Sequence, residues 1–100
     1  MKKISRIRFL LLASLDLKEI VSYHKQNNSF YAKKFIKKIN QTKKLLLIFP
    51  QIGKRKYIEK GHYYFFKIDR YILIYMINND EILIVRILHK KRDIDYILKA

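Results

Sequence analysis

Short apolar runs separated by turn residues dominate the last third of the chain. Two runs span residues 63–68 and 70–77, a third starts at Glu81, and each is rich in β-branched and aromatic residues. Such runs are typical of strands, and the sequence Asn78-Asn79-Asp80 is typical of a tight turn. The pattern predicts an antiparallel meander of three strands.

The middle run is apolar on both of its faces, because alternate side chains of a strand point to opposite sides of a sheet. The two sets are Tyr71, Leu73, Tyr75 and Ile77 against Ile72, Ile74 and Met76. We therefore expect the meander to be covered on both sides, on one by helices and on the other by the end of the chain or by a partner.

In the first half of the chain, the apolar residues recur with a different spacing. Residues 4–9 alternate imperfectly between apolar and polar side chains, which predicts a first strand. From about Leu11 to Lys25 and from about Ser29 to Ile48, apolar residues recur at helical spacing. Ser29 is expected to cap the second helix, and Pro50 to stop it. The stripe expected to be buried on this helix is Ala32, Phe35, Ile36, Ile39 and Leu46.

Two helices joined by a short connection form an antiparallel hairpin. After the meander, Asp93 can cap a short final helix that runs through Leu98. The order strand, helix, helix, three strands and short helix predicts an α+β fold, with residues 1–100 in one domain.

Composition adds a strong electrostatic preference. The net charge is +15 on 100 residues, and no Asp or Glu occurs between Glu19 and Glu59. Such a chain is attracted to nucleic acid, to the ribosome or to an acidic protein. There is no cysteine, which excludes disulfides and thiolate metal sites, and the histidines lack ligand spacing, so we expect neither a metal nor a cofactor.

The start of the chain imitates a signal peptide, with two lysines before the apolar residues 9–13. This apolar stretch is interrupted at Asp16, and nothing approaches the roughly 20 apolar residues that span a bilayer. We expect a cytoplasmic protein without a membrane segment.

Four motifs in order carry a resemblance to a known family. They are Ala13-x-x-Asp16-Leu17-x-Glu19-Ile20, Phe49-Pro50-x-x-Gly53, Arg70-Tyr71-Ile72-Leu73-Ile74-Tyr75 and Arg86-Ile87-Leu88-His89-x-x-Arg92-Asp93. With the predicted element order, the chain resembles the toxins of the RelE/ParE superfamily. The resemblance implies the toxin of a type II toxin–antitoxin pair, which inhibits growth and is held in a hetero-oligomer by a cognate acidic antitoxin. Relatives often have a Ser-Pro cap where this chain has Leu10-Leu11.

The superfamily has two activities. One branch cleaves messenger RNA in the ribosome and needs a set of basic side chains on the meander. Here Tyr63, Phe65 and Ile72 occupy such positions, and Arg92 alone matches clearly. The other branch, ParE-like, poisons DNA gyrase by binding, and the Leu-His-x-x-Arg-Asp ending favours it. The candidate catalytic residues for the endoribonuclease alternative are Arg92, His89, Arg86 and Tyr96.

A target surface is expected among the basic residues of the second helix, the loop that follows it and the C-terminal loop. These residues are Lys33, Lys37, Lys44, Lys54, Arg55, Lys56, Lys90 and Lys91. A further alternative is a basic nucleic-acid-binding module without toxicity, or a degenerate relic of the toxin fold.

Each candidate site residue also has a structural explanation. His89 can tie the last loop to the backbone or to Asp93. Arg86 can emerge at the rim of the sheet or pair with an acid such as Asp69. Arg92 can form a solvated pair with Asp93 worth roughly 0–1 kcal/mol.

Overall fold

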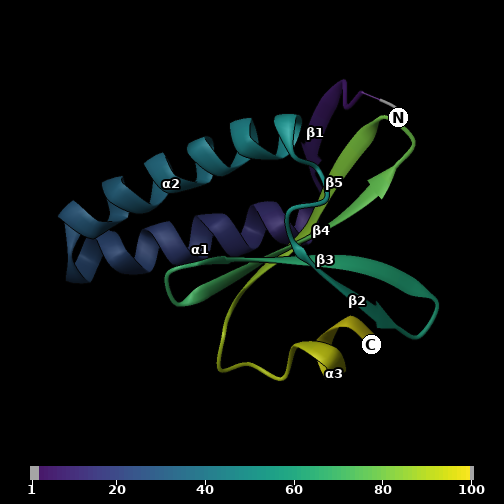
Figure 1. Ribbon diagram of the computed structural model, residues 1–100. Coiled ribbons are helices and arrows are strands. Elements are labelled where there is room, and N and C mark those ends of the chain that lie inside the picture. The colour runs from purple at the N-terminus through teal and green to yellow at the C-terminus, as the bar shows by residue number, and fades with distance from the viewer. Residues whose placement is uncertain (1–2, 100) are drawn as a thin grey trace.

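The computed structural model describes residues 3–99 and shows a helical hairpin, a sheet and a short C-terminal helix (Figure 1). The elements are β1 (Arg6–Phe9), α1 (Leu11–Asn27), α2 (Ser29–Ile48), β2 (Lys54–Ile58), β3 (Gly61–Ile68), β4 (Tyr71–Asn78), β5 (Glu81–His89) and α3 (Ile94–Lys99). The α+β fold expected from the sequence is confirmed.

The five strands form one sheet in the order β1-β5-β4-β3-β2. Neighbours from β2 to β5 are antiparallel, whereas β1 runs parallel to β5. The hairpin of α1 and α2 therefore connects β1, at one edge of the sheet, to β2 at the opposite edge. β4 and β5 lie in the middle of the sheet, which explains why β4 is apolar on both faces.

The sheet has one strand more than the expected meander, because β2 precedes it at the edge. The sequence analysis placed Lys54, Arg55 and Lys56 in a loop. These three consecutive basic residues hide the alternation of a strand, but they suit an edge, where lysine and arginine discourage pairing with another chain.

Side chains from the helical hairpin cover one face of the sheet. Ala13, Phe35 and Leu46 are fully buried or nearly so against Leu73 and Tyr75. On the other face, Ile94 of α3 packs with Ile74 and Leu88. The expectation that both faces are covered is confirmed, and the chain's own end covers the second one.

Two details of α2 differ from the sequence-based expectation. Ser29 is the first helical residue and not the cap, because the Asn28 side chain accepts a hydrogen bond of 3.1 Å from the Tyr31 N–H. Ile36 is 39% exposed, and Thr42 is buried in its place. The buried positions 32, 35, 39, 42 and 46 follow a spacing of three and four, and Ile36 lies beside that stripe. At α3, Asp93 forms the expected cap by accepting from the Tyr96 N–H at 3.2 Å.

The connection between α2 and β2 is fixed by a buried tyrosine. The Tyr75 hydroxyl donates to the Pro50 carbonyl at 2.8 Å and accepts from the Gly53 N–H at 3.0 Å. A Cβ on Gly53 would lie 2.9 Å from the Tyr75 oxygen, so only glycine allows this approach. Burial raises the pKa of Tyr75, which stays a neutral hydrogen-bonding group.

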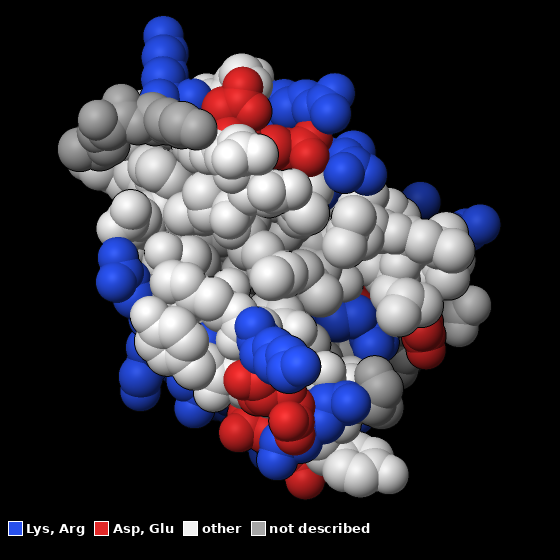
Figure 2. Space-filling model, turned by 90° about the vertical axis from the view of Figure 1, so that its right-hand side faces the viewer, with Lys and Arg blue, Asp and Glu red and all other residues white. Residues whose placement is uncertain are grey.

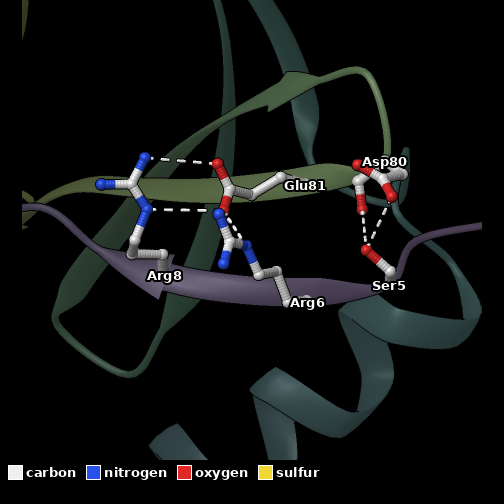
Figure 3. Close-up of polar contacts among 5 residues, drawn as sticks. All are labelled: Ser5, Arg6, Arg8, Asp80 and Glu81. Atoms are coloured by element: carbon white, nitrogen blue, oxygen red, sulfur yellow. Dashed lines mark hydrogen bonds and ion pairs between the residues drawn. The ribbon is translucent and has the colours of Figure 1, made fainter.

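β1 is held to β5 by charged side chains as well as by backbone pairing (Figure 3). Both Arg6 and Arg8 contact the Glu81 carboxylate, with Arg8 Nη2 at 3.2 Å from Oε1. The Ser5 hydroxyl donates to Asp80 Oδ2 at 2.8 Å. Hydrogen bonds from Arg8 and then from Arg6 lower the pKa of Glu81 below its ordinary value. The carboxylate is therefore ionised and bridges two arginines that would otherwise repel each other.

Candidate functional site

The end of β5 contains the residues that the sequence analysis singled out, and the first of them, Arg86, is bound to Asp16 of α1. The Arg86 Nε and Nη2 atoms donate to the Asp16 oxygens at 2.8 and 3.0 Å. The hydrogen bonds that Arg86 donates to Asp16 raise the pKa of Arg86. The suggestion that Arg86 pairs with Asp69 is wrong, because the Asp69 carboxylate binds Tyr31 and Lys38.

Asp16 also accepts a hydrogen bond of 3.0 Å from the Ile87 backbone N–H. β1 ends at Phe9, whose partner in β5 is Ile84, so β5 continues beyond its parallel neighbour. The Asp16 carboxylate satisfies an N–H of β5 beyond the end of β1. Asp16 and Arg86 thus join α1 to the sheet, and two nitrogens of the guanidinium are engaged within the fold.

His89 ends β5 and organises the turn that follows. Its Nδ1 accepts from the Lys91 N–H at 3.1 Å, and its carbonyl accepts from the Arg92 N–H at 3.0 Å. The ring also meets Tyr71 edge-on, with centroids 5.5 Å apart. The structural explanation of His89, a tie between the last loop and the backbone, is confirmed.

Arg92 and Tyr96 are both exposed. In the described part of the chain Arg92 forms no ion pair with Asp93, whose carboxylate caps α3 instead. Arg92 lines a hollow of about 210 Å³ together with His89, whereas Tyr96 lies on α3 with 71% of its surface exposed. Among residues 3–99, no side-chain hydrogen bond joins any two of Arg86, His89, Arg92 and Tyr96. Of these four residues, only His89 and Arg92 line the same hollow.

The eight basic residues expected on a target surface lie on three separate parts of the fold. Lys33, Lys37 and Lys44 are on α2, the residues 54–56 are in β2, and the residues 90–91 are in the turn after β5. Arg55 is partly engaged, because its Nη2 donates to Gln51 Oε1 at 2.7 Å. Figure 2 shows one face whose middle is uncharged, with charged side chains gathered towards its ends. On this face the charged side chains of both signs are therefore unevenly distributed.

A polar hollow of about 510 Å³ at the far end of the helical hairpin was not anticipated from the sequence. Its walls include Tyr23, Tyr31 and Lys34 of the helices, Arg70 of the β3–β4 turn and Tyr71 of β4. The helical residues and the residues of the β3–β4 turn are far apart in the chain. The only signals of this hollow in the sequence are Tyr23 among the polar positions of α1 and Arg70 in a hairpin turn. Neither signal reveals that the residues meet.

The described residues contain neither a candidate metal site nor a membrane-spanning helix. Among residues 3–99, no three His, Cys, Asp or Glu side chains lie close enough together to bind a metal ion. None of the helices in these residues is long and apolar enough to cross a membrane.

The chain is a small basic α+β protein with a helical hairpin on a five-stranded sheet. The family model described as the ParE toxin of the type II toxin–antitoxin system, parDE, matches residues 7–94. The chain belongs to this family, which assigns it the role of a toxin.

Among solved structures, the chain is similar to one from the chromosomal ParDE toxin–antitoxin system of P. aeruginosa. The TM-score is 0.71, the identity is 19%, and the match covers 87% of this chain and 96% of the other. At this identity the likeness shows the fold. A comparison with curated proteins found no match.

Proposed function

We propose that this toxin inhibits growth by binding DNA gyrase on DNA, and that it acts as a poison and not as a ribonuclease. Membership of the ParE family supports this mechanism over the ribosome-dependent cleavage of messenger RNA. A gyrase target requires the protein to act in the cytoplasm.

The observation that carries the proposal is the bidentate contact between Asp16 and Arg86. An RNA-cleaving toxin needs basic groups that are free to stabilise charge at a scissile phosphate. Of the expected set, Arg86 is held by Asp16 within the fold, and the His89 Nδ1 accepts from the Lys91 N–H, which leaves Arg92 as the one free arginine of that set in the described chain. A toxin that acts only by binding does not need free basic groups at a scissile phosphate.

The partner that silences the toxin is an antitoxin, and we propose that it is acidic and amphipathic. A hollow of about 440 Å³ between β1 and the C-terminal half of α2 has this complementary chemistry. Arg6, Lys43 and Lys44 contribute positive charge, and Ile7 and Leu47 contribute apolar surface. Beside it, Ile48 is 69% and Phe49 56% exposed. An acidic segment with apolar residues would neutralise the first set and bury the second.

The test uses purified toxin, free of antitoxin, in a gyrase supercoiling assay that also scores double-strand breaks. The expected result is loss of supercoiling with trapped cleaved DNA, reversed by the acidic product of an adjacent gene. Unaffected gyrase at saturating toxin would overturn the proposal. Cleavage of ribosome-bound message would then establish the ribonuclease, and salt-sensitive binding without growth arrest would establish a simple nucleic-acid-binding module.

A further inference from the structure

The hollow at the far end of the helical hairpin continues into a second one. The first, of about 510 Å³, and the second, of about 210 Å³, share Tyr23 and Tyr71 in their walls. Together they form a groove that starts at Lys34 and Arg70 and ends at Arg92. We call it the hairpin-end groove and define it by Tyr23, Lys34, Arg70, Tyr71, His89 and Arg92. Two acids also line the second hollow: Asp16, which is paired with Arg86, and the exposed Glu19.

The turn that brings Arg70 to this groove is fastened to α2. Asp69 adopts a left-handed backbone conformation with φ of 55°, which is uncommon for a residue other than glycine. Its Oδ2 accepts from the Tyr31 hydroxyl at 2.8 Å, and its Oδ1 accepts from Lys38 Nζ at 2.7 Å. These bonds, Lys38 first, lower the pKa of Asp69. The single acid in the first hollow is thus neutralised by neighbours, and the two cations beside it are not.

The cations of the groove are free of partners within the described part of the chain. The side chains of Lys34, Arg70 and Arg92 make no hydrogen bond and no ion pair there, and all three residues are exposed. The turn is held a second time by the Lys90 N–H, which donates to the Arg70 carbonyl at 2.8 Å. A turn held by hydrogen bonds therefore presents exposed positive groups that have no partner in the described chain.

The aromatic wall between these cations is also fixed. The His24 Nε2 lies 2.8 Å from the Tyr71 hydroxyl, and the His24 ring meets Tyr31 and Tyr23 edge-on at 4.6 and 5.1 Å. Burial and the hydrogen bond to Asp69 raise the pKa of Tyr31 to about 12, so its hydroxyl stays protonated. Tyr23 ends this cluster with 60% of its surface exposed, and its ring is open to a ligand.

We propose that the hairpin-end groove binds a single strand of nucleic acid. Lys34, Arg70 and Arg92 would contact successive phosphates, and a base would stack on Tyr23. Unpaired cations that follow a groove and an exposed aromatic ring between them are what single strands require. The first hollow has no aliphatic side chain in its wall, and of the three that line the second, Ile87 and Leu88 are buried and Ile20 is half-buried. An acidic amphipathic peptide would therefore find little apolar surface to cover in this groove. This inference does not depend on gyrase being the target.

The test measures binding of a fluorescently labelled oligothymidylate to the full chain by anisotropy. The double variant Lys34→Gln/Arg70→Gln is compared with Lys18→Gln/Lys60→Gln, which removes the same charge from exposed positions outside the groove. We expect the groove variant to lose at least about tenfold in affinity and the control to lose less than about threefold. All four side chains are exposed, so both variants fold, which circular dichroism checks.

A second pair of variants isolates stacking at unchanged charge. Tyr23→Ala is expected to weaken binding by about fivefold or more, since stacking of one base is worth roughly 1–3 kcal/mol. Tyr23→Phe keeps the ring and should bind as the parent does, and Tyr57→Ala removes an equally exposed ring elsewhere. Equal losses in the two charge variants, or full affinity in Tyr23→Ala, would overturn the proposal. So would preferential binding of an acidic peptide in the groove.

Discussion

Asp16 of α1 and Arg86 of β5 form the link between the helical hairpin and the centre of the sheet. Their side chains are joined by two hydrogen bonds of 2.8 and 3.0 Å, and only 13% and 20% of their side-chain surfaces are exposed. The same carboxylate binds the Ile87 N–H, so one acid serves both a side chain and the backbone. These motif residues support the fold, which directs the search for a target surface to other parts of the molecule.

Replacing Asp16 by asparagine should therefore destabilise the protein. The change keeps the size of the side chain but leaves the Arg86 charge without its counter-charge, and hydrogen bonds to charged groups are worth about 1.5–3 kcal/mol. We expect the free energy of unfolding in urea to fall by that amount. Glu19→Gln, which removes an exposed acid on the same helix, should change it by less than about 0.5 kcal/mol. Equal effects of the two substitutions would contradict a specific role for Asp16.

The Tyr75 hydroxyl is a second testable link, because it connects β4 to the loop after α2. Tyr75→Phe would leave the Gly53 N–H and the Pro50 carbonyl without their partner in a buried place. A loss of about 1–3 kcal/mol in unfolding free energy is expected, as for buried polar groups left unsatisfied. Thermal unfolding measures this, with Tyr57→Phe as the exposed control. Unchanged stability would mean that water replaces the hydroxyl.

The sequence predicted those parts of the fold that local hydrophobic patterns encode. The period of α2 and the three apolar runs gave the hairpin, the meander and the covering of both faces of β4. β2 was missed because residues 54–56 are all basic, and an edge strand needs no apolar alternation. Ile36 was expected to be buried but is exposed, because helical spacing shows which side of a helix is buried but not how wide the buried stripe is.

The site could not be derived in the same way. Asp16 and Arg86 are separated by 70 residues, and nothing local indicates that they meet. The same holds for Tyr23, Lys34 and Arg70, which three different elements and turns bring to one groove. The motif from Arg86 to Asp93 carried the resemblance to the family, and three of its polar side chains, Arg86, His89 and Asp93, make hydrogen bonds within the fold.

The contact of Glu81 with Arg6 and Arg8 predicts how stability depends on pH. Its lowered pKa means that ionised Glu81 stabilises the fold at neutral pH, and that this contribution is lost as the pH falls through 4.5 and below towards the folded-state value. The difference in unfolding free energy between the parent and Glu81→Gln should therefore shrink from about pH 6 to about pH 3. Glu59→Gln, an exposed acid in the β2–β3 turn, should show no such convergence. A difference that is constant with pH would show that the arginines do not act through the charge of Glu81.

Arg92 distinguishes a poison that acts by binding from an enzyme. Its side chain is exposed and makes no hydrogen bond in the described chain, so Arg92→Ala should leave the fold intact. If the toxin acts by binding, loss of one exposed cation should raise the concentration for half-maximal gyrase inhibition by about tenfold or less, that is, by up to about 1.4 kcal/mol. Removing a group that stabilises charge in a transition state costs about 10²–10³ in rate.

The measurement is a titration of gyrase supercoiling with the parent, Arg92→Ala and the control Lys60→Ala, each confirmed as folded by circular dichroism. A modest shift for Arg92→Ala, and a smaller one for Lys60→Ala, is the expected result, because Arg92 lies in a groove and Lys60 in an exposed turn. Growth arrest on expression should persist in Arg92→Ala at higher protein levels. Complete loss of growth arrest in Arg92→Ala at full expression, accompanied by loss of message cleavage, would instead make Arg92 a catalytic residue and the protein a ribonuclease.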